Sequence, residues 1–168
     1  MDSLLAVKIL RNVSVKTYPF TDYFKGFEEV EAAKQIFGDK TAEVLRNLRV
    51  EFYSGRGCMS FSDVDGHIRV NVNYLNNGDV TYLYLDIIHE LVHVKQFMEG
   101  KKIFSKNLIH VDRYMEIEAC RHAVDEARRL GLSDERIFEY LRTDRIREED
   151  LRKLAKALNV RVDAPPKT

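Results

Sequence analysis

The sequence predicts an α+β fold in which a small antiparallel β-sheet packs against helices. Two observations lead to this class. Short segments of alternating apolar and polar residues gather within residues 49–73, and apolar residues at helical spacing fill much of the chain before and after them. Strands that are grouped together, rather than alternating one by one with helices, are typical of α+β proteins.

The N-terminal part predicts helical structure ahead of the sheet. Residues Ser3 to Val15 fit a strand and a short helix equally well. From Phe27 to Leu48, apolar residues recur at helical spacing, and Gly38-Asp39 is a candidate break. We therefore expect a helical stretch, interrupted once, before the first clear strand.

Three strands are expected next. Arg49 to Ser54 and Cys58 to Ser62 are separated by a glycine-rich turn. Asp65-Gly66 is a typical hairpin turn, and it leads into His67 to Asn73, where apolar and polar residues alternate. These strands predict the antiparallel sheet.

The second half of the chain predicts helices with recognisable ends. Asp79 is a good N-cap for an apolar helix from Tyr82 to Met98, which stops at Gly100. A further helix is expected from residue 111 or 112 to Leu130.

The last part predicts two more helices and sets the expected boundaries. Ser133 caps one helix, and an amphipathic helix covers Glu148 to Leu158. Residues 1–168 are expected to form a single domain. Its core covers about residues 27–131, and a C-terminal helical extension covers about residues 132–168.

Composition excludes several functional classes. The 27 basic and 27 acidic residues cancel, which argues against nucleic acid as a partner. No apolar run approaches the ~20 residues that span a bilayer, so no membrane partner is expected. Cys58 and Cys120 cannot form a disulfide framework, which favours a cytoplasmic protein. Many Arg, Lys and Glu residues with only two Gln are typical of a thermophile.

The motif His89-Glu90-Leu91-Val92-His93 lies within the apolar helix. Residues four apart lie about 40° from each other around a helix axis, so both imidazoles can share one ion. Imidazoles suit Zn²⁺, and one zinc ion per chain is the expected cofactor. Glu90 lies about 100° from His89, so it flanks the metal as the candidate catalytic base.

A catalytic zinc site also needs a third protein ligand, and two glutamates compete for this role. Glu116 lies on the stripe expected to face inward. That stripe also contains Cys120, Ala123, Ala127 and Leu130. Glu118 lies about 200° away, on a polar face that water is expected to cover. We therefore predict Glu116 as the ligand.

These motifs resemble those of the gluzincin metallopeptidases, in which two His on one helix and a Glu on a later helix bind zinc. The segment Glu116-Ile117-Glu118-Ala119, about twenty residues after the first motif, is similar to the ligand helix of the minigluzincins and of the ImmA/IrrE-type regulatory proteases. The resemblance implies a zincin-like fold and a metallopeptidase acting on a peptide or protein substrate. It also implies that Glu116 binds zinc and that Glu90 activates a zinc-bound water.

The resemblance implies further site residues. In related enzymes, the strand before the metal helix borders the cleft and pairs with an extended substrate. The corresponding residues here are Val70, Asn71, Val72 and Asn73. Gluzincins commonly steady the oxyanion with a Tyr or His. The candidates are Tyr114, His110 and His122. Cys120 stands where relatives often carry an Asp or Asn that supports a ligand.

Two other functions stay open. A regulatory, protease-like module would act on one protein partner, and a non-catalytic domain would use zinc only for stability. The segment Arg142 to Thr168 lies outside the region of resemblance. It is expected either to pack as an ordinary helix or to fill the cleft and make the enzyme latent.

Overall fold

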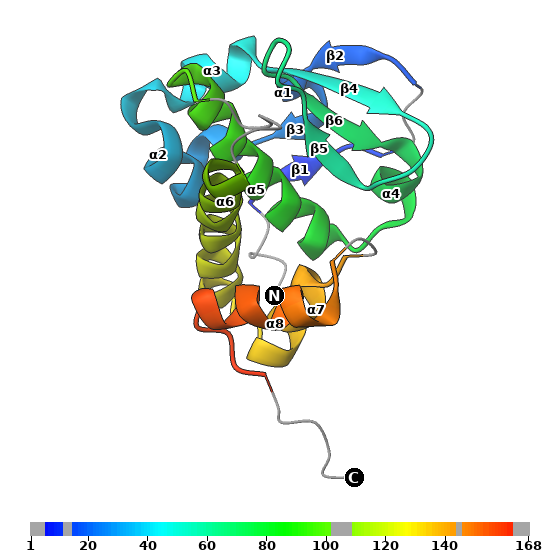
Figure 1. Ribbon diagram of the computed structural model, residues 1–168. Coiled ribbons are helices and arrows are strands. Elements are labelled where there is room, and N and C mark those ends of the chain that lie inside the picture. The colour runs from blue at the N-terminus through cyan, green and yellow to red at the C-terminus, as the bar shows by residue number, and fades with distance from the viewer. Residues whose placement is uncertain (1–5, 12–14, 102–108, 144–145, 163–168) are drawn as a thin grey trace, which may run out of the picture.

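Helices and strands of the chain form an α+β arrangement, which confirms the predicted class (Figure 1). The structure is a computed structural model that describes residues 6–11, 15–101, 109–143 and 146–162, with side chains left out at 109–113. The long helix α5 (Val80–Met98) runs diagonally past the sheet, α6 (Ile109–Arg129) lies beside it, and the C-terminal helices lie beneath both.

The main sheet has four strands in the order β2-β4-β6-β5. Their bounds are Thr17–Pro19 for β2, Arg49–Tyr53 for β4, Met59–Phe61 for β5 and Ile68–Asn71 for β6. The strands β1 (Lys8–Ile9) and β3 (Phe24–Lys25) form a separate antiparallel pair. Residues 3–15, whose sequence fits a strand and a short helix equally well, therefore include a short strand.

The sheet departs from the expected antiparallel arrangement at one pair. The predicted hairpin joins β5 and β6, but β4 pairs with β6, and this pair is parallel. Alternating residues predict that a segment is a strand but do not specify its neighbour, so the pairing was not readable from the pattern. As a result, β6 is a central strand and β5 lies at the sheet edge.

Strand β6 also ends earlier than expected. The Asn71 side chain accepts hydrogen bonds from the backbone N–H groups of Asn73 and Tyr74, which makes it the N-cap of helix α4 (Val72–Asn77). Asn is among the most favourable N-cap residues, so the chain turns into a helix at this point despite the apolar–polar alternation.

Helix α5 forms the centre of the molecule. Asp79 caps it as predicted, by accepting from the backbone N–H groups of Thr81 and Tyr82. Its apolar side chains are buried on several sides, because it packs against β5, α2 (Glu31–Phe37) and α6. Among the described helices, none has the length and apolar character required to cross a membrane.

The helical stretch before the sheet is interrupted at the expected place. Helix α2 ends at Gly38, whose φ of 61° favours glycine, and α3 (Thr41–Asn47) follows. The remaining elements in this stretch are the short helix α1 (Phe20–Tyr23) and the 3₁₀ turns η2 (Phe27–Glu29) and η3 (Gly38–Lys40).

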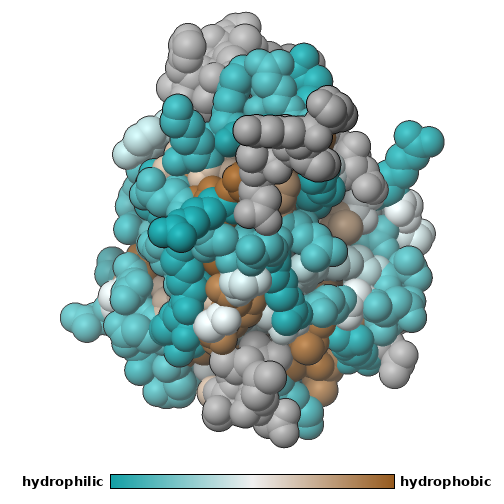
Figure 2. Space-filling model, turned by 90° about the horizontal axis from the view of Figure 1, so that it is seen from below, coloured by the Kyte–Doolittle hydropathy of each residue, from teal (hydrophilic) through white to brown (hydrophobic). Residues whose placement is uncertain are grey.

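The C-terminal helices α7 (Asp134–Leu141) and α8 (Glu148–Ala157) lie where the last two helices were predicted. Ser133 caps α7, as expected. Helix α8 buries Leu151 and Ala155, and the Arg128 guanidinium donates to the carbonyls of Leu158 and Asn159 just beyond it. Viewed from this end, the surface is mostly hydrophilic, with narrow hydrophobic strips (Figure 2).

The position of α8 bears on the idea that it makes an enzyme latent. Arg128 anchors the end of α8 near the C-terminus of α6, whereas Glu116 lies twelve residues earlier on α6. This difference corresponds to about 18 Å along the helix. The anchored end of α8 therefore belongs to the packing of the α6 C-terminus, as expected of an ordinary packing helix.

A buried carboxylate ties α5 to α6. Glu126 is 4% exposed, accepts a 2.6 Å hydrogen bond from the Tyr84 hydroxyl and forms two bonds with the Arg129 guanidinium. Burial alone raises the pKa of Glu126, but the hydrogen bonds from Arg129 and Tyr84 outweigh it and lower the pKa below its usual value. The unfolded chain therefore binds a proton at Glu126 more readily than the folded chain.

This arrangement predicts a pH-dependent loss of stability in Glu126→Gln. The carboxylate stabilises the fold fully above its unfolded pKa of about 4.3, and this contribution is lost as pH falls through the lowered folded pKa. We expect the free energy of unfolding to drop by about 1–3 kcal/mol at pH 7, and the difference to shrink below about pH 4. Urea unfolding across this range measures both values, with the exposed Glu43→Gln as control. A difference independent of pH contradicts the assignment.

Candidate metal centre

Three side chains from two helices converge on one point. His89 and His93 come from α5 and Glu116 comes from α6. The two imidazole Nε2 atoms lie 3.2 Å apart, and the Glu116 carboxylate oxygens lie 3.2 Å from His89 Nε2 and 3.1 Å from His93 Nε2. Ligand atoms about 2.0–2.1 Å from a tetrahedral zinc ion lie about 3.3–3.4 Å apart. The spacing of these atoms therefore fits a single zinc-sized ion.

The sequence explains why these atoms meet. The spacing of four residues places both histidines on one face of α5. The side chains of Ala119, Ala123 and Ala127 are fully buried, and their small size allows α6 to approach α5 closely. Glu116 lies one turn before this stripe, so the same packing brings its carboxylate to the two imidazoles.

The electrostatics of the cluster favour a cation. Burial opposes a charge on His89, but the Glu116 carboxylate outweighs it and raises the pKa of His89 well above its usual value. Partial burial likewise opposes ionisation of Glu116, yet the two imidazoles hold its pKa far below the usual range. The Glu116 side chain is 53% exposed, so the cluster is open to solvent on its α6 side.

Glu90 lies beside the cluster without joining it. It is 6% exposed, and its Oε2 atom is buried with no hydrogen-bond partner among the described residues. Burial raises the pKa of the Glu90 carboxyl to about 7, although the neighbouring imidazoles act in the opposite direction. Burying a carboxylate oxygen without a hydrogen-bond partner costs free energy. The Glu90 Oε2 atom therefore marks a position where a polar partner that accompanies a metal is expected.

Glu118 is partly buried and contacts α5, whereas the sequence interpretation expected it on a face covered by water. Its carboxylate accepts a 2.7 Å hydrogen bond from the Gln96 side-chain amide, which also contacts the His93 ring. The helical angle placed Glu118 outside the His89–His93–Glu116 cluster, as the structure does, but it could not show that Gln96 of α5 reaches across to Glu118. Gln96 lies three residues after His93, on the same side of the helix, and this placement was the available clue.

Asp86 is a second residue that the sequence interpretation missed. It lies on α5 one turn before His89 and accepts hydrogen bonds from the hydroxyls of Tyr74 at 2.5 Å and Tyr140 at 2.8 Å. A carboxylate between Leu85 and Ile87 in an apolar helix is unusual and could have been noticed. Its partners could not, because they belong to α4 and α7.

Cys120 is the residue that stands where the families resembled by the sequence often have Asp or Asn. It is buried, its Sγ lies 3.8 Å from Glu116 Oε1, and it also hydrogen-bonds His89. Burial raises the pKa of the Cys120 thiol, so it contacts Glu116 and His89 as a neutral group. The Cys120 thiol therefore makes a weaker contact in the place where a carboxylate was expected to support a ligand.

The predicted substrate-binding residues do not form an available strand edge. Val70 and Asn71 lie in β6, which pairs with β4 on one side and β5 on the other. Val72 and Asn73 lie in helix α4. Within the described sheet, the edge strand that lies near the candidate metal centre is β5, and its Phe61 ring centroid lies 6.2 Å from that of His93.

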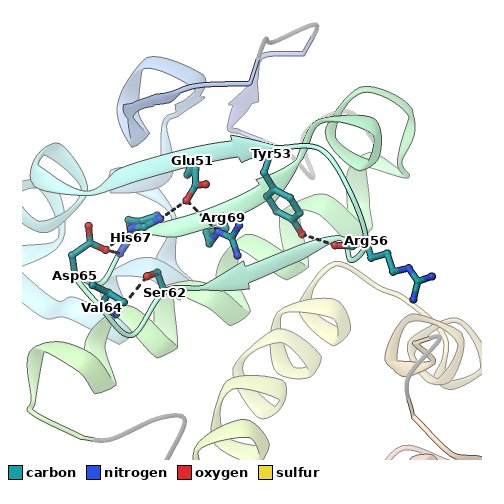
Figure 3. A network of polar contacts seen from close by, with 8 residues as sticks. All are labelled: Glu51, Tyr53, Arg56, Ser62, Val64, Asp65, His67 and Arg69. Atoms are coloured by element: carbon teal, nitrogen blue, oxygen red, sulfur yellow. Dashed lines mark hydrogen bonds and ion pairs between the residues drawn. The ribbon is translucent and has the colours of Figure 1, made fainter.

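A polar network fixes the β5–β6 hairpin against β4 (Figure 3). The His67 ring contacts Asp65 within the hairpin and lies 2.7 Å from Glu51 on β4. The Arg69 side chain donates to the same Glu51 carboxylate and lies over the Tyr53 ring. His67 is therefore engaged within the sheet, and the network ties the hairpin turn and β6 to β4.

The three candidates for oxyanion stabilisation remain predictions. Tyr114 is 68% exposed, two residues before Glu116. His122 is partly buried, and burial lowers its pKa. It lies six residues after Glu116, about 9 Å farther along α6. The His110 side chain lies outside the described part of the chain.

Comparisons with known proteins add no relative. Models of protein families, curated proteins and solved structures were searched, and none matches this chain. The functional interpretation therefore rests on the geometry of the site itself.

Proposed function

We propose that this protein is a zinc-dependent metallopeptidase with a zincin-like arrangement of its sheet and metal helices. The observation that carries the proposal is the convergence of His89, His93 and Glu116 beside the buried, unpaired Glu90 carboxylate. An ion-binding cluster alone would suit a structural site. A cluster with a general base next to it, and with one side open to solvent, suits hydrolysis.

The donor set fits zinc. Two imidazole nitrogens and one carboxylate oxygen are ligands that Zn²⁺ accepts, and three protein ligands leave a fourth position open, as catalytic sites require. Structural zinc sites usually close that position with a fourth protein ligand. Of the described residues, only these three form a group of metal-ligand type.

The chain supplies the proton transfers. Zinc, when bound, would polarise a peptide carbonyl and make a water molecule more acidic. Glu90 would accept a proton from that attacking water and deliver it to the leaving nitrogen. Its pKa of about 7 is suited to both steps, because a group with a pKa near the working pH gains and loses protons readily.

The edge strand β5 is the proposed substrate platform. One side of β5 is occupied by β6, and its other side is the edge of the described sheet. An extended peptide can add there as a further strand, using backbone hydrogen bonds that tolerate many sequences. Phe61, at the end of β5, packs against His93 and Phe97 of α5, so a peptide on this edge would pass the metal centre.

Metal content and hydrolysis together test the proposal. We expect about one zinc per chain in protein purified without chelators, and slow cleavage of casein. A chelator should abolish cleavage, and added zinc should restore it. Zinc without cleavage of casein would point to action on a single partner or to a structural zinc site. Failure to bind any divalent metal would refute the proposal.

A further inference from the structure

A chain of hydrogen bonds leads away from the metal centre to Glu118. His93 Nδ1 lies 2.8 Å from Gln96 Oε1, on the side of the ring away from the cluster. Gln96 Nε2 donates to Glu118 Oε2 at 2.7 Å and to the Met115 carbonyl at 3.1 Å. His93 and Gln96 are 3% and 1% exposed, so water does not replace these contacts readily.

The two acceptors fix which way the Gln96 amide points. A backbone carbonyl and an ionised carboxylate can only accept hydrogen bonds, so the amide NH₂ group of Gln96 must face them. The amide oxygen then necessarily faces His93. In the opposite orientation, an oxygen would face two other oxygens, and the buried amide would lose both of its bonds.

The orientation of Gln96 in turn fixes the tautomer of His93. Because the amide oxygen only accepts, the Nδ1 atom of a neutral His93 must carry the hydrogen and donate it. The Nε2 atom then has a free lone pair, and this is the atom that faces His89 and Glu116. The other tautomer would present an N–H group to the cluster and could not bind an ion.

We propose that Gln96 and Glu118 are positioning residues that hold His93 in its metal-binding tautomer. The proposal rests on the proposed function, because the metal centre is the one inferred above. One turn of α6 supplies the ligand Glu116 together with both acceptors, the Met115 carbonyl and Glu118. Closing α6 onto α5 therefore delivers the third ligand and selects the correct form of the second in the same packing event.

Zinc affinity provides the first test. Gln96→Met keeps the length of the side chain without its polar atoms, and Glu118→Ala removes one acceptor. Competition with a chromophoric chelator should show zinc binding about 10- to 100-fold weaker in both variants, the loss typical of such supporting residues. Glu118→Gln should stay close to wild type, because its amide oxygen still accepts from Gln96. Asp125→Asn, an exposed change on the same helix, is the control.

The tautomer itself provides a second test that does not depend on zinc. Two-bond ¹⁵N–¹H correlation spectra of the metal-free full chain, at a pH where His93 is observed neutral, distinguish Nδ1–H from Nε2–H imidazole. Wild type and Glu118→Gln should show the Nδ1–H form for His93, and Gln96→Met should show a mixture. Wild-type zinc affinity in Gln96→Met, or an Nε2–H form in the wild type, overturns the proposal. If the wild type binds no zinc but shows the Nδ1–H form, the proposed function fails and the positioning of His93 stands.

Discussion

Replacing Glu90 with Gln is expected to lower the rate of peptide hydrolysis about 10²- to 10⁴-fold, the range that general bases contribute, while zinc content stays near one per chain. The amide keeps the shape of the side chain but cannot accept a proton. Glu90 is not among the three ligands, so metal binding should persist. Steady-state kinetics on one cleaved peptide and metal analysis of the same samples measure both quantities.

The same variant should be no less stable than the wild type. Glu90 is a buried carboxyl with one oxygen that lacks a partner, and a neutral amide is less costly to bury than a carboxylate. Glu99→Gln, an exposed change at the C-cap of the same helix, is the matched control and should retain full activity. Loss of zinc from Glu90→Gln would instead make Glu90 a ligand, and full activity would remove it from the chemistry.

Replacing Glu116 with Ala is expected to weaken zinc binding by more than about 100-fold, beyond the loss typical of supporting residues. The cluster would keep two imidazoles but lose its only carboxylate. A ligand that binds the folded chain stabilises it by about 2.7 kcal/mol at 100 times its Kd. Added zinc should therefore raise the melting temperature of the wild type and leave that of Glu116→Ala nearly unchanged.

Glu118→Gln is the control for this second experiment. It changes a glutamate two residues away, on the same helix, while keeping the hydrogen bond to Gln96. A zinc-dependent rise in melting temperature should persist in this variant. If Glu116→Ala keeps the rise and Glu118→Gln loses it, the assignment of the third ligand is reversed.

The helices and caps of this chain were predictable because they depend on local chemistry. Asp79 and Ser133 act as N-caps in the structure, and the helical stretch before the sheet breaks at Gly38, all as expected from neighbouring residues alone. The parallel pairing of β4 with β6 was not predictable, because it joins segments that are not consecutive strands. The end of β6 at Asn71 shows a local cap overriding an alternating pattern.

The candidate site shows the same division between features set by neighbouring residues and features set by distant segments. The positions of the candidate ligands on α5 and α6 follow from helix geometry, and His89, His93 and Glu116 do meet in the structure. The surroundings depend on which helices lie side by side. Gln96 and Asp86 are both on the predicted metal helix, but their partners come from α4, α6 and α7, so their roles appear only in three dimensions.

The position of the partners of Asp86 has a consequence for how each new molecule matures. A ribosome releases the chain from its N-terminus, so Tyr74 emerges before Asp86, and Tyr140 emerges 54 residues after it. All three proposed ligands are outside before Tyr140 is. Until Tyr140 is released, Asp86 Oδ1 lacks the partner that it has in the folded chain, and water can take that place. Assembly of the three proposed ligands therefore need not wait for α7, and they can meet in a chain whose α7 has not yet docked against Asp86.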